Sequence, residues 1–251
     1  TFMRGEMLKI QGLPDSAGAY GAAVVMAGGE GTRLRPHTQH MPKPMLAIGG
    51  MPLLERNIRA LSAVGVRRFF LSVNYLAHVI EDHFGDGSRL GVKIEYLRET
   101  EPLGTGGALR LIGQEPDGPL LVMNGDLLSG LNAGRMLEFH NENGAAMTVA
   151  ATEYVIEIPF GVLHTSGVGI VGLSEKPNER YLCNAGIYTV SSQVLTDLPG
   201  PARFDMTTLI EHILAKQGRV VAFPMYELWK DIGTPDQLEE ARKLVEPGEI
   251  S

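Results

Sequence analysis

The sequence predicts an α/β fold with a Rossmann-like, mostly parallel sheet, helices on both faces of that sheet, and a smaller antiparallel lobe. Three observations lead to this prediction. Short apolar runs alternate with segments of helical periodicity, and glycines and prolines fall between these segments. The length of 251 residues, with 44% apolar side chains, suits one α/β domain with a large core.

Five apolar runs are predicted to be strands, and the first is followed directly by glycines. They are Ala22–Met26, Phe69–Val73, Val92–Leu97, Leu120–Met123 and Met147–Ala151. Helical patterns, some begun by proline or ended near glycine, lie at Pro52–Val64, Leu76–Phe84, Ala108–Ile112, Asn132–Asn143, Met206–Lys216 and Pro235–Leu244. This alternation implies parallel strands, so a ligand is expected at their carboxyl ends. The segment from Phe160 to Tyr188 is richer in strands and turns and is expected to form the antiparallel lobe.

The first 21 residues do not share this alternation. Gly12, Pro14 and Gly18 are typical of turns and linkers. We therefore expect residues 1–21 to be a linker or the remnant of an upstream domain, and residues 22–251 to form the folded domain.

Composition narrows the class of partner. The chain has 22 basic and 29 acidic residues, a net charge of −7, which argues against a nucleic-acid groove or an anionic membrane surface. No apolar run approaches the roughly 20 residues that span a bilayer, and the N-terminus lacks the apolar segment of a signal peptide. The single cysteine, Cys183, excludes an internal disulfide and fits a reducing compartment, so a cytoplasmic protein is expected.

The stretch Gly28-Gly29-Glu30-Gly31-Thr32-Arg33-Leu34 follows the first strand and suits a phosphate-binding loop. Glycines there let backbone N–H groups approach a phosphate. Leu34 stands where a dinucleotide fingerprint needs glycine, and no P-loop lysine follows. Further on, Pro42 and Pro44 flank Lys43 and restrict where its ammonium group can point.

Together, Gly28 to Met45 resembles the signature of the sugar-1-phosphate nucleotidylyltransferase family, G-G-x-G-T-R-L-x-P-x-T-x-x-x-P-K-P. The resemblance extends from about Ala22 to Leu238. It implies that Gly28, Gly29, Gly31 and Thr32 bind the NTP phosphates and that Ala27 also belongs to the nucleotide site. It also implies that Arg33 holds the departing pyrophosphate and that Lys43 neutralises the reacting phosphates.

A second glycine cluster, Gly104 to Gly107, resembles the base-binding loop of the mannose-1-phosphate and heptose-1-phosphate guanylyltransferase branches. Gly104 and Thr105 are therefore expected to contact the nucleotide. Glu99, just upstream, lies where relatives often carry a base-reading glutamine. A carboxylate only accepts hydrogen bonds, so Glu99 suits the N1–H and N2–H donors of guanine. Alternatively, Glu99 points into solvent and backbone amides near Gly104 read the base.

The resemblance also implies a metal site and a sugar-binding lobe. Asp126, in Asn124-Gly125-Asp126 after a buried strand, and Asp231, in the W-x-D-x-G-T stretch, would bind Mg²⁺. The sugar 1-phosphate would be bound by Gly161, Glu175, Lys176 and Asn184. Arg33, Lys43 and Asp126 are thus the expected catalytic residues.

The implied reaction is in-line attack of a sugar-1-phosphate oxygen on the α-phosphorus of an NTP, with GTP favoured. Two alternatives stay open: a uridylyl-, thymidylyl- or cytidylyltransferase of the same family, and a catalytically silent nucleotide-sensing domain. The charged residues of the motifs are all present, which favours an active enzyme. A homo-oligomer and an upstream regulatory domain in the full-length chain are further possibilities that the sequence leaves open.

Overall fold

The protein, in a computed structural model that describes residues 19–245, is built on one seven-stranded sheet of order β12-β8-β11-β6-β1-β4-β5. The strands are β1 (Ala22–Met26), β4 (Arg68–Val73), β5 (Lys93–Arg98), β6 (Leu120–Asn124), β8 (Met147–Glu157), β11 (Asn178–Val190) and β12 (Val220–Met225). Only β11 runs antiparallel to its neighbours β6 and β8. The predicted α/β fold with a mostly parallel sheet is therefore confirmed.

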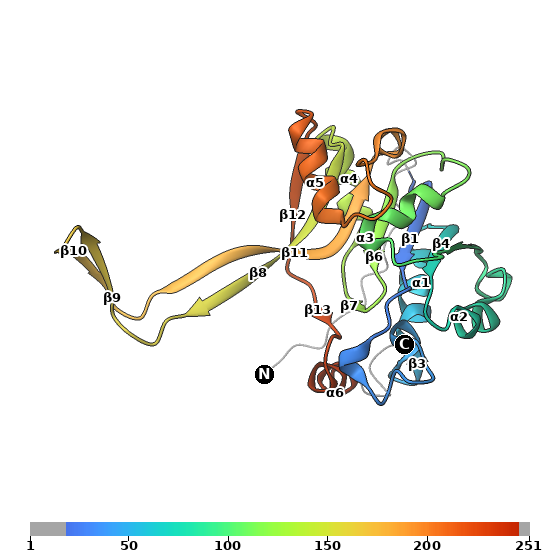
Figure 1. Ribbon diagram of the computed structural model, residues 1–251, viewed down its shortest axis with the longest axis horizontal. Coiled ribbons are helices and arrows are strands. Elements are labelled where there is room, and N and C mark those ends of the chain that lie inside the picture. Colours follow the sequence, from blue (N-terminus) through green and yellow to red (C-terminus); the bar gives the residue numbers. More distant parts are fainter. Residues whose placement is uncertain (1–18, 246–251) are drawn as a thin grey trace, which may run out of the picture.

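Helices cover both faces of the sheet (Figure 1). They are α1 (Leu53–Ala63), α2 (Ala77–Phe84), the single turn α3 (Gly104–Gly107), α4 (Ala133–Glu142), α5 (Met206–Ala215) and α6 (Pro235–Leu244). Side chains of α1, α2 and α4 join the core on one face, and those of α5 join the core on the other. Alternate residues of β1 therefore enter different cores. Ala23 and Val25 pack in the core with α1, α2 and α4, and Ala22 and Val24 pack in the core with α5.

A third core cluster lies outside the main sheet. It joins the buried side chains of Leu34, Ile48, Leu128, Ile232 and Leu238. These come from short elements and α6: two two-stranded sheets pair β2 (Ala47–Ile48) with β3 (Met51–Pro52) and β7 (Leu127–Ser129) with β13 (Trp229–Asp231). The cluster thus fixes the segment after the glycine loop and the segment that carries Asp231.

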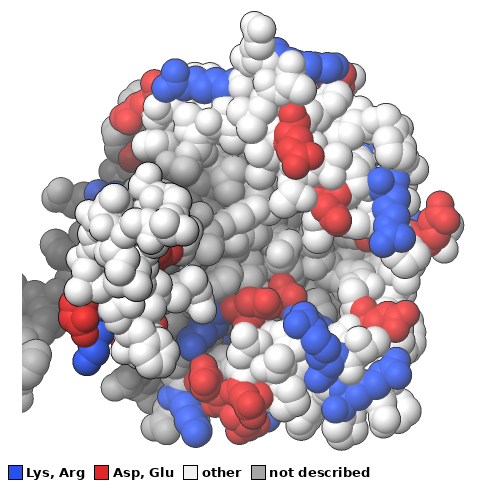
Figure 2. All heavy atoms as spheres, turned by 60° about the vertical axis from the view of Figure 1, so that its left-hand side comes forward, with Lys and Arg blue, Asp and Glu red and all other residues white. Residues whose placement is uncertain are grey.

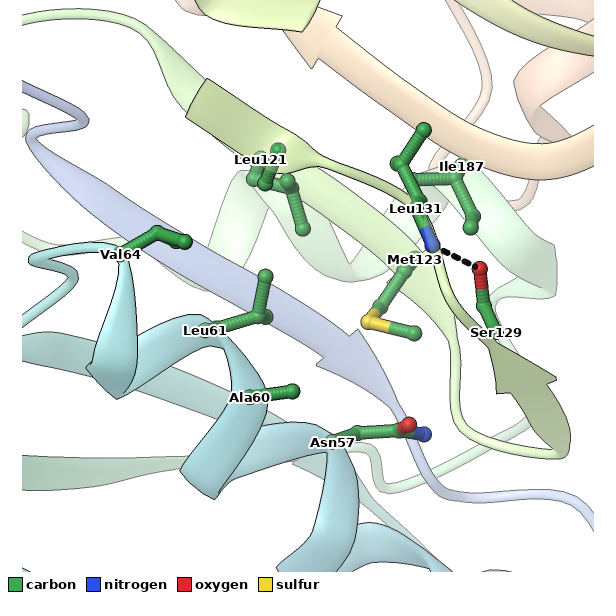
Figure 3. A pocket seen from close by; sticks show the side chains of 10 residues that line it. Asn57, Ala60, Leu61, Val64, Leu121, Met123, Ser129, Leu131 and Ile187 are labelled. Atoms are coloured by element: carbon green, nitrogen blue, oxygen red, sulfur yellow. Dashed lines mark hydrogen bonds between the residues drawn. The ribbon is translucent and has the colours of Figure 1, made fainter. Parts of the chain in front are cut away.

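A small cavity remains between α1 and the sheet (Figure 3). Its volume is about 30 Å³, and Leu61, Met123 and Ile187 are among its apolar walls. Asn57 donates a hydrogen bond to the carbonyl of Leu127, at 2.9 Å. The size and apolar lining indicate a packing defect of the core rather than a substrate site.

The antiparallel part of the chain projects from the body of the molecule (Figure 1). β8 and β11 leave the sheet together and stay paired out to Glu157 and Asn178, and a hairpin of β9 (Val162–Ser166) and β10 (Gly169–Ser174) follows. We call residues 152–183 the arm. The predicted antiparallel strands are present, but they do not pack against the face of the domain that carries them.

Several predicted boundaries differ from the observed ones. The strand predicted at Met147–Ala151 continues to Glu157, and the helix predicted at Ala108–Ile112 is a short 3₁₀ segment, Ala108–Leu111. The predicted linker 1–21 lies almost wholly outside the described residues. Tyr20 is already core, because its hydroxyl donates to the carbonyl of Ala133 and bonds Thr189. None of the described helices is both long and apolar enough to cross a bilayer.

One buried histidine gives the fold a pH dependence. His140 is 2% exposed, and its Nδ1 and Nε2 bond the hydroxyls of Thr148 and Ser191. The Ser191 hydroxyl donates to the carbonyl of Ala145, so it accepts from Nε2–H, and Thr148 donates to Nδ1. Both ring nitrogens of the neutral imidazole are thus satisfied. Burial lowers the pKa of His140 below its ordinary 6.5.

We expect the free energy of unfolding to fall as pH drops from 7.5 to 5, and to fall less in His140→Gln. Because the pKa of His140 is lower in the folded chain than in the unfolded chain, the unfolded chain binds more protons as the pH falls through 6.5, and stability is lost by at most about 1.4 kcal/mol per pH unit for one proton. Urea titrations at several pH values measure this. His78→Gln, at an exposed histidine, is the control and should retain the wild-type slope. Equal slopes for wild type and His140→Gln would exclude His140 as the source.

Candidate active site

The candidate site lies at the carboxyl edge of the parallel strands. The chain runs from β1 to β4 and β5 on one side and returns to β6 on the other, so the strand order reverses beside β1. Ligands bind at such reversal points in open α/β sheets. A pocket of about 280 Å³ lies here, with Gly28, Glu99, Gly104, Asn124 and Asp126 among its lining residues. The space-filling view from the side of the arm shows a hollow, with acidic and basic side chains gathered below it (Figure 2).

The glycine loop after β1 is held close to Lys43. Gly31 has φ +60°, a left-handed conformation, and a Cβ there would lie 3.0 Å from Cβ of Lys43 and from Cγ2 of Thr38. Thr38, fully buried, donates a hydrogen bond to the carbonyl of Gly31 at 2.7 Å. Only glycine therefore permits this turn and this close packing. Gly28 and Gly29 line the pocket.

Lys43 is the centre of the charged group. It is 8% exposed and begins a short 3₁₀ turn, Lys43–Met45, directly after Pro42. Its Nζ bonds the carboxylate of Asp126 and lies 3.8 Å from Oδ1 of Asp231. A buried lysine between two carboxylates is a positioned cation rather than a solvated surface charge.

Asp126 and Asp231 meet although 105 positions separate them, because β7 and β13 pair antiparallel with Asp231 opposite Leu127. The backbone N–H of Ile232 also donates to the carbonyl of Asp126, at 3.1 Å. Burial, and then the charge of Asp126, raise the pKa of Asp231, while Lys43 and Arg33 act in the opposite direction. Arg33 contributes to the same group, since its guanidinium lies 3.3 Å from where a Cβ on Gly233 would stand.

The two carboxylates fit a magnesium ion. Oδ1 of Asp231 is buried and lacks a hydrogen-bond partner among the described residues, so an acceptor is available next to Asp126. Mg²⁺ is commonly bound by one or two carboxylates together with waters and substrate phosphates. Within residues 19–245, no three His, Cys, Asp or Glu side chains form a metal-binding group, and Asp126 and Asp231 are the candidate pair.

Glu99 faces the pocket and is half-buried. Its Oε2 accepts the backbone N–H of Leu103 at 2.8 Å, and Oε1 accepts from the hydroxyl of Ser72. Each oxygen keeps a second lone pair for a ligand. The alternative in which Glu99 points into solvent does not fit this arrangement.

The second glycine cluster is pinned to the segment before α5. Gly104 has φ +79°, and a Cβ on it would lie 2.6 Å from the carbonyl oxygen of Phe204. The carboxylate of Asp205 accepts both the backbone N–H of Thr105, at 2.9 Å, and its hydroxyl, at 3.2 Å. Asp205 therefore places Gly104 and Thr105 on the pocket wall.

A second pocket, of about 240 Å³, adjoins Asp231 on the other side of β6. It is lined by Asn124, Asn184, Tyr188, Trp229 and Asp231, among others. The register of β11 shifts between Asn184 and Tyr188, and Gly186 in this bulge has φ +71°. The bulge turns the strand so that Asn184 donates to the hydroxyl of Tyr188, at 2.9 Å.

The remaining sugar-phosphate residues lie elsewhere. Gly161, Glu175 and Lys176 are on the arm, next to the β9–β10 hairpin. They are near one another, since a Cβ on Gly161 would lie 3.0 Å from Oε2 of Glu175. Lys176 has φ +44°, a strained conformation for a residue with a side chain. The structure thus gathers this trio but holds it away from Lys43 and Asp126 of the same chain (Figure 1).

Among the lining residues that sequence reasoning missed, four have side chains that can form hydrogen bonds: Asn124, Tyr188, Asp205 and Trp229. Asp205 directly precedes a predicted helix, a position that suggests a helix cap, but its side chain bonds Thr105 instead. Asn124 and Trp229 stood inside the quoted motifs without a role. Trp229 donates its indole N–H to the carbonyl of Ala185, at 2.8 Å, and so supports the bulge.

The family model described as nucleotidyl transferase matches residues 22–247. A mannose-1-phosphate guanylyltransferase of Mycobacterium tuberculosis is 34% identical over 221 residues, covering 85% of this chain and 61% of that protein. The chain therefore spans about three fifths of the length of that relative.

Solved structures share the fold. A Bacillus anthracis protein, described as a glucose-1-phosphate thymidylyltransferase in complex with a sucrose, has a TM-score of 0.73 at 23% identity, covering 92% of this chain and 97% of its own. HddC from Yersinia pseudotuberculosis, complexed with GMP-PN, has a TM-score of 0.66 at 27% identity, covering 89% and 98%. The first likeness concerns the fold alone.

Proposed function

We propose that this chain, which belongs to the nucleotidyl transferase family, joins GTP to a sugar 1-phosphate and releases pyrophosphate. Mannose 1-phosphate is the first candidate for the sugar substrate, because the Mycobacterium tuberculosis relative is named a mannose-1-phosphate guanylyltransferase. The complex of HddC with GMP-PN supports guanine as the base. The cytoplasmic location expected from the single cysteine stays a prediction.

The observation that carries this proposal is the position of Lys43 and the two carboxylates. Asp126 lines the pocket of the glycine loop, Asp231 lines the neighbouring pocket, and Lys43 contacts both carboxylates from below the loop. Phosphates of a nucleotide in one pocket and of a sugar in the other would meet at this point. The residues there are the ones that charge stabilisation of phosphoryl transfer needs.

The proposed reaction needs no general base, because a phosphate oxygen of the sugar 1-phosphate is already ionised at neutral pH. That oxygen attacks the α-phosphorus of GTP, the bond from the α-phosphorus to the bridging oxygen breaks, and pyrophosphate leaves with the bonding electron pair. Lys43 stabilises the charge that develops on the α-phosphate. Arg33, on the 3₁₀ turn Thr32–Leu34 that ends the glycine loop, holds the leaving pyrophosphate.

Mg²⁺ is the proposed cofactor, held by Asp126 and Asp231. When bound, it would neutralise the negative charge of the phosphates it contacts. Lys43 bonds Asp126 and so reduces the repulsion between the paired carboxylates. The role of this chain's own residues is therefore to hold two like charges close together, ready for a cation.

Pyrophosphate release, measured with each of four NTPs and a panel of sugar 1-phosphates, tests the proposed function. We expect the highest kcat/KM with GTP and a mannose-like or heptose-like sugar. Faster pyrophosphate release with UTP, dTTP or CTP than with GTP would identify the chain as a uridylyl-, thymidylyl- or cytidylyltransferase instead. Nucleotide binding without release for any pair would support the alternative of a sensing domain.

Glu99→Gln is expected to lower the preference for GTP over UTP by about tenfold or more. The free lone pairs of Glu99 can accept two donors of guanine, whereas the amide of glutamine offers one acceptor, and an unpaired buried polar group costs about 1–3 kcal/mol. The measurement is kcat/KM for GTP and for UTP in both proteins. Glu101→Gln, an exposed glutamate two positions along the same loop, is the matched control. A GTP/UTP ratio that Glu99→Gln leaves unchanged would show that Glu99 only supports the loop through Leu103.

A further inference from the structure

The arm exposes apolar side chains that a single chain does not cover. Among them are Phe160, Leu163, Ile170, Val171, Leu173 and Leu182, each more than half exposed. A two-stranded hairpin is marginal on its own, and single chains rarely leave a contiguous apolar patch of more than a few hundred Å² open to water. A partner surface is therefore expected to cover the arm.

The arm also carries residues that belong to the proposed reaction but cannot reach it in their own chain. β8 runs parallel to β6, so the arm leaves the sheet at the carboxyl edge, the edge that holds the active site. From Asn184, which lines the second pocket, to Asn178 the strand spans about 20 Å at roughly 3.3 Å per residue. Glu175 and Lys176 lie beyond that point, too far away for their side chains to enter the pocket.

The ladder of the arm keeps this distance. Pairs from Asn184 opposite Ala151 to Asn178 opposite Glu157 follow one another without a break. The register shifts only nearer the body, between Asn184 and Tyr188. A continuous two-stranded ladder is stiff, so the end of the arm does not fold back onto the body of its own chain and is free to contact another molecule.

The body of the molecule offers a surface for such an arm beside the open pocket. Tyr226 is 88% exposed and Leu228 is 42% exposed. Both lie shortly before Trp229 and Asp231 in the sequence, and these two residues line the second pocket. An apolar arm that carries a lysine thus has an apolar patch and a carboxylate as its complement. Each chain has both an arm and this body surface. Two chains related by a two-fold axis would therefore form two identical arm-to-body contacts.

We propose that two copies of this chain exchange arms, so that Glu175 and Lys176 of each copy complete the sugar-phosphate side of the other copy's active site. The inference rests on the proposed function for the roles of these two residues, but not for the exchange itself. In this dimer, the body of the second copy covers the apolar side chains of the arm. The arm in turn covers the open side of the second copy's second pocket.

Mass measurements test the exchange without reference to activity. Sedimentation equilibrium should give twice the 27.2 kDa of one chain. A variant in which a short Gly-Ser loop replaces residues 160–175 removes the β9–β10 hairpin and should give the mass of one chain, with a far-UV circular dichroism spectrum that keeps its helical signal. A monomeric 251-residue chain, or a shortened variant that stays dimeric, would overturn the proposal.

Mixed dimers test where the active site is completed. Lys176→Ala damages the arm and Asp126→Asn damages the body, so each variant alone should be inactive or nearly so. When the two variants are co-expressed, about half of the dimers are mixed, and each mixed dimer has one site with an intact body and an intact arm from the other copy. We expect about a quarter of the wild-type activity from this mixture.

The matched control is co-expression of Asp126→Asn with Lys43→Ala. Both substitutions lie in the body, so no mixed dimer contains an undamaged site and activity should stay at the level of the single variants. If the arm served its own body, the first mixture would recover nothing either, and that result would overturn the exchange. Full activity of Lys176→Ala on its own would overturn it as well. Absence of activity in the wild type would instead contradict the proposed function and leave the mass measurements as the test of the exchange.

Discussion

Lys43→Ala is expected to lower kcat about 10²–10³-fold, equivalent to roughly 3–4 kcal/mol of transition-state stabilisation, while the KM for GTP changes much less. The ammonium group is held at the carboxylates by Pro42, Pro44 and the packing of Gly31, so its position needs no reorganisation when charge develops on the α-phosphate. Removing it takes away a preorganised charge that the nucleotide phosphates in the pocket would otherwise share. Steady-state pyrophosphate release over a range of GTP concentrations gives both constants.

The control for this variant is Lys93→Ala, at an exposed lysine that pairs with Glu95 on the edge strand β5. It removes the same charge from the chain and should leave kcat unchanged. Lys43→Ala also leaves Asp126 and Asp231 without their common cation, so thermal unfolding of each variant separates lost stability from lost catalysis. Wild-type kcat in a folded Lys43→Ala protein would contradict the role of Lys43.

Asp126→Asn is expected to abolish Mg²⁺-dependent activity while the protein stays folded. Asparagine has nearly the volume of aspartate but not its charge, and Asp126 is one of only two carboxylates in the group formed with Lys43 and Asp231. The measurement is the rate of pyrophosphate release as Mg²⁺ is raised, together with the circular dichroism spectrum. No concentration of Mg²⁺ should restore the wild-type rate.

A matched variant for this experiment is Asp117→Asn, at an aspartate in the loop before β6. It changes the total charge equally and should leave the Mg²⁺ dependence as it is. If Asp126→Asn kept wild-type activity with unchanged Mg²⁺ dependence, the metal would have to be bound elsewhere.

The elements that sequence reasoning placed well are those whose signal is local. β1 and β6 are buried on both faces and read as continuous apolar runs, and the helices α1 and α4 have clear apolar periodicity. β12 was missed because Pro224 and the polar flanks obscure it, and it lies at the edge of the sheet, where proline is tolerated. β7 and β13 have three residues each, too few for any periodicity.

In the candidate site, too, the residues that sequence reasoning found are those within recognisable local motifs. The resemblance of their motifs implied that Asp126 and Asp231 meet, and the structure brings both carboxylates together at Lys43. The destination of the arm could not be predicted, because alternating strand residues specify a hairpin but not the surface on which it rests. Asp205 was missed for a similar reason. Its hydrogen-bond partner Thr105 is 100 positions away, and no local sequence pattern predicts a bond between them.

The third core cluster joins α6 to the segment that carries Arg33. Leu34, one residue after Arg33, shares this cluster with Leu238 and Ala241 of α6, and with Val245 just beyond it. A Cβ on Gly49 would collide with Val245, so the fit between the two ends of the fold is close. The segment that follows the glycine loop is therefore held in place by residues about two hundred positions later in the sequence. Until α6 packs against this cluster, Leu34 lacks the side chains that bury it, so we expect GTP binding to appear only after α6 has docked.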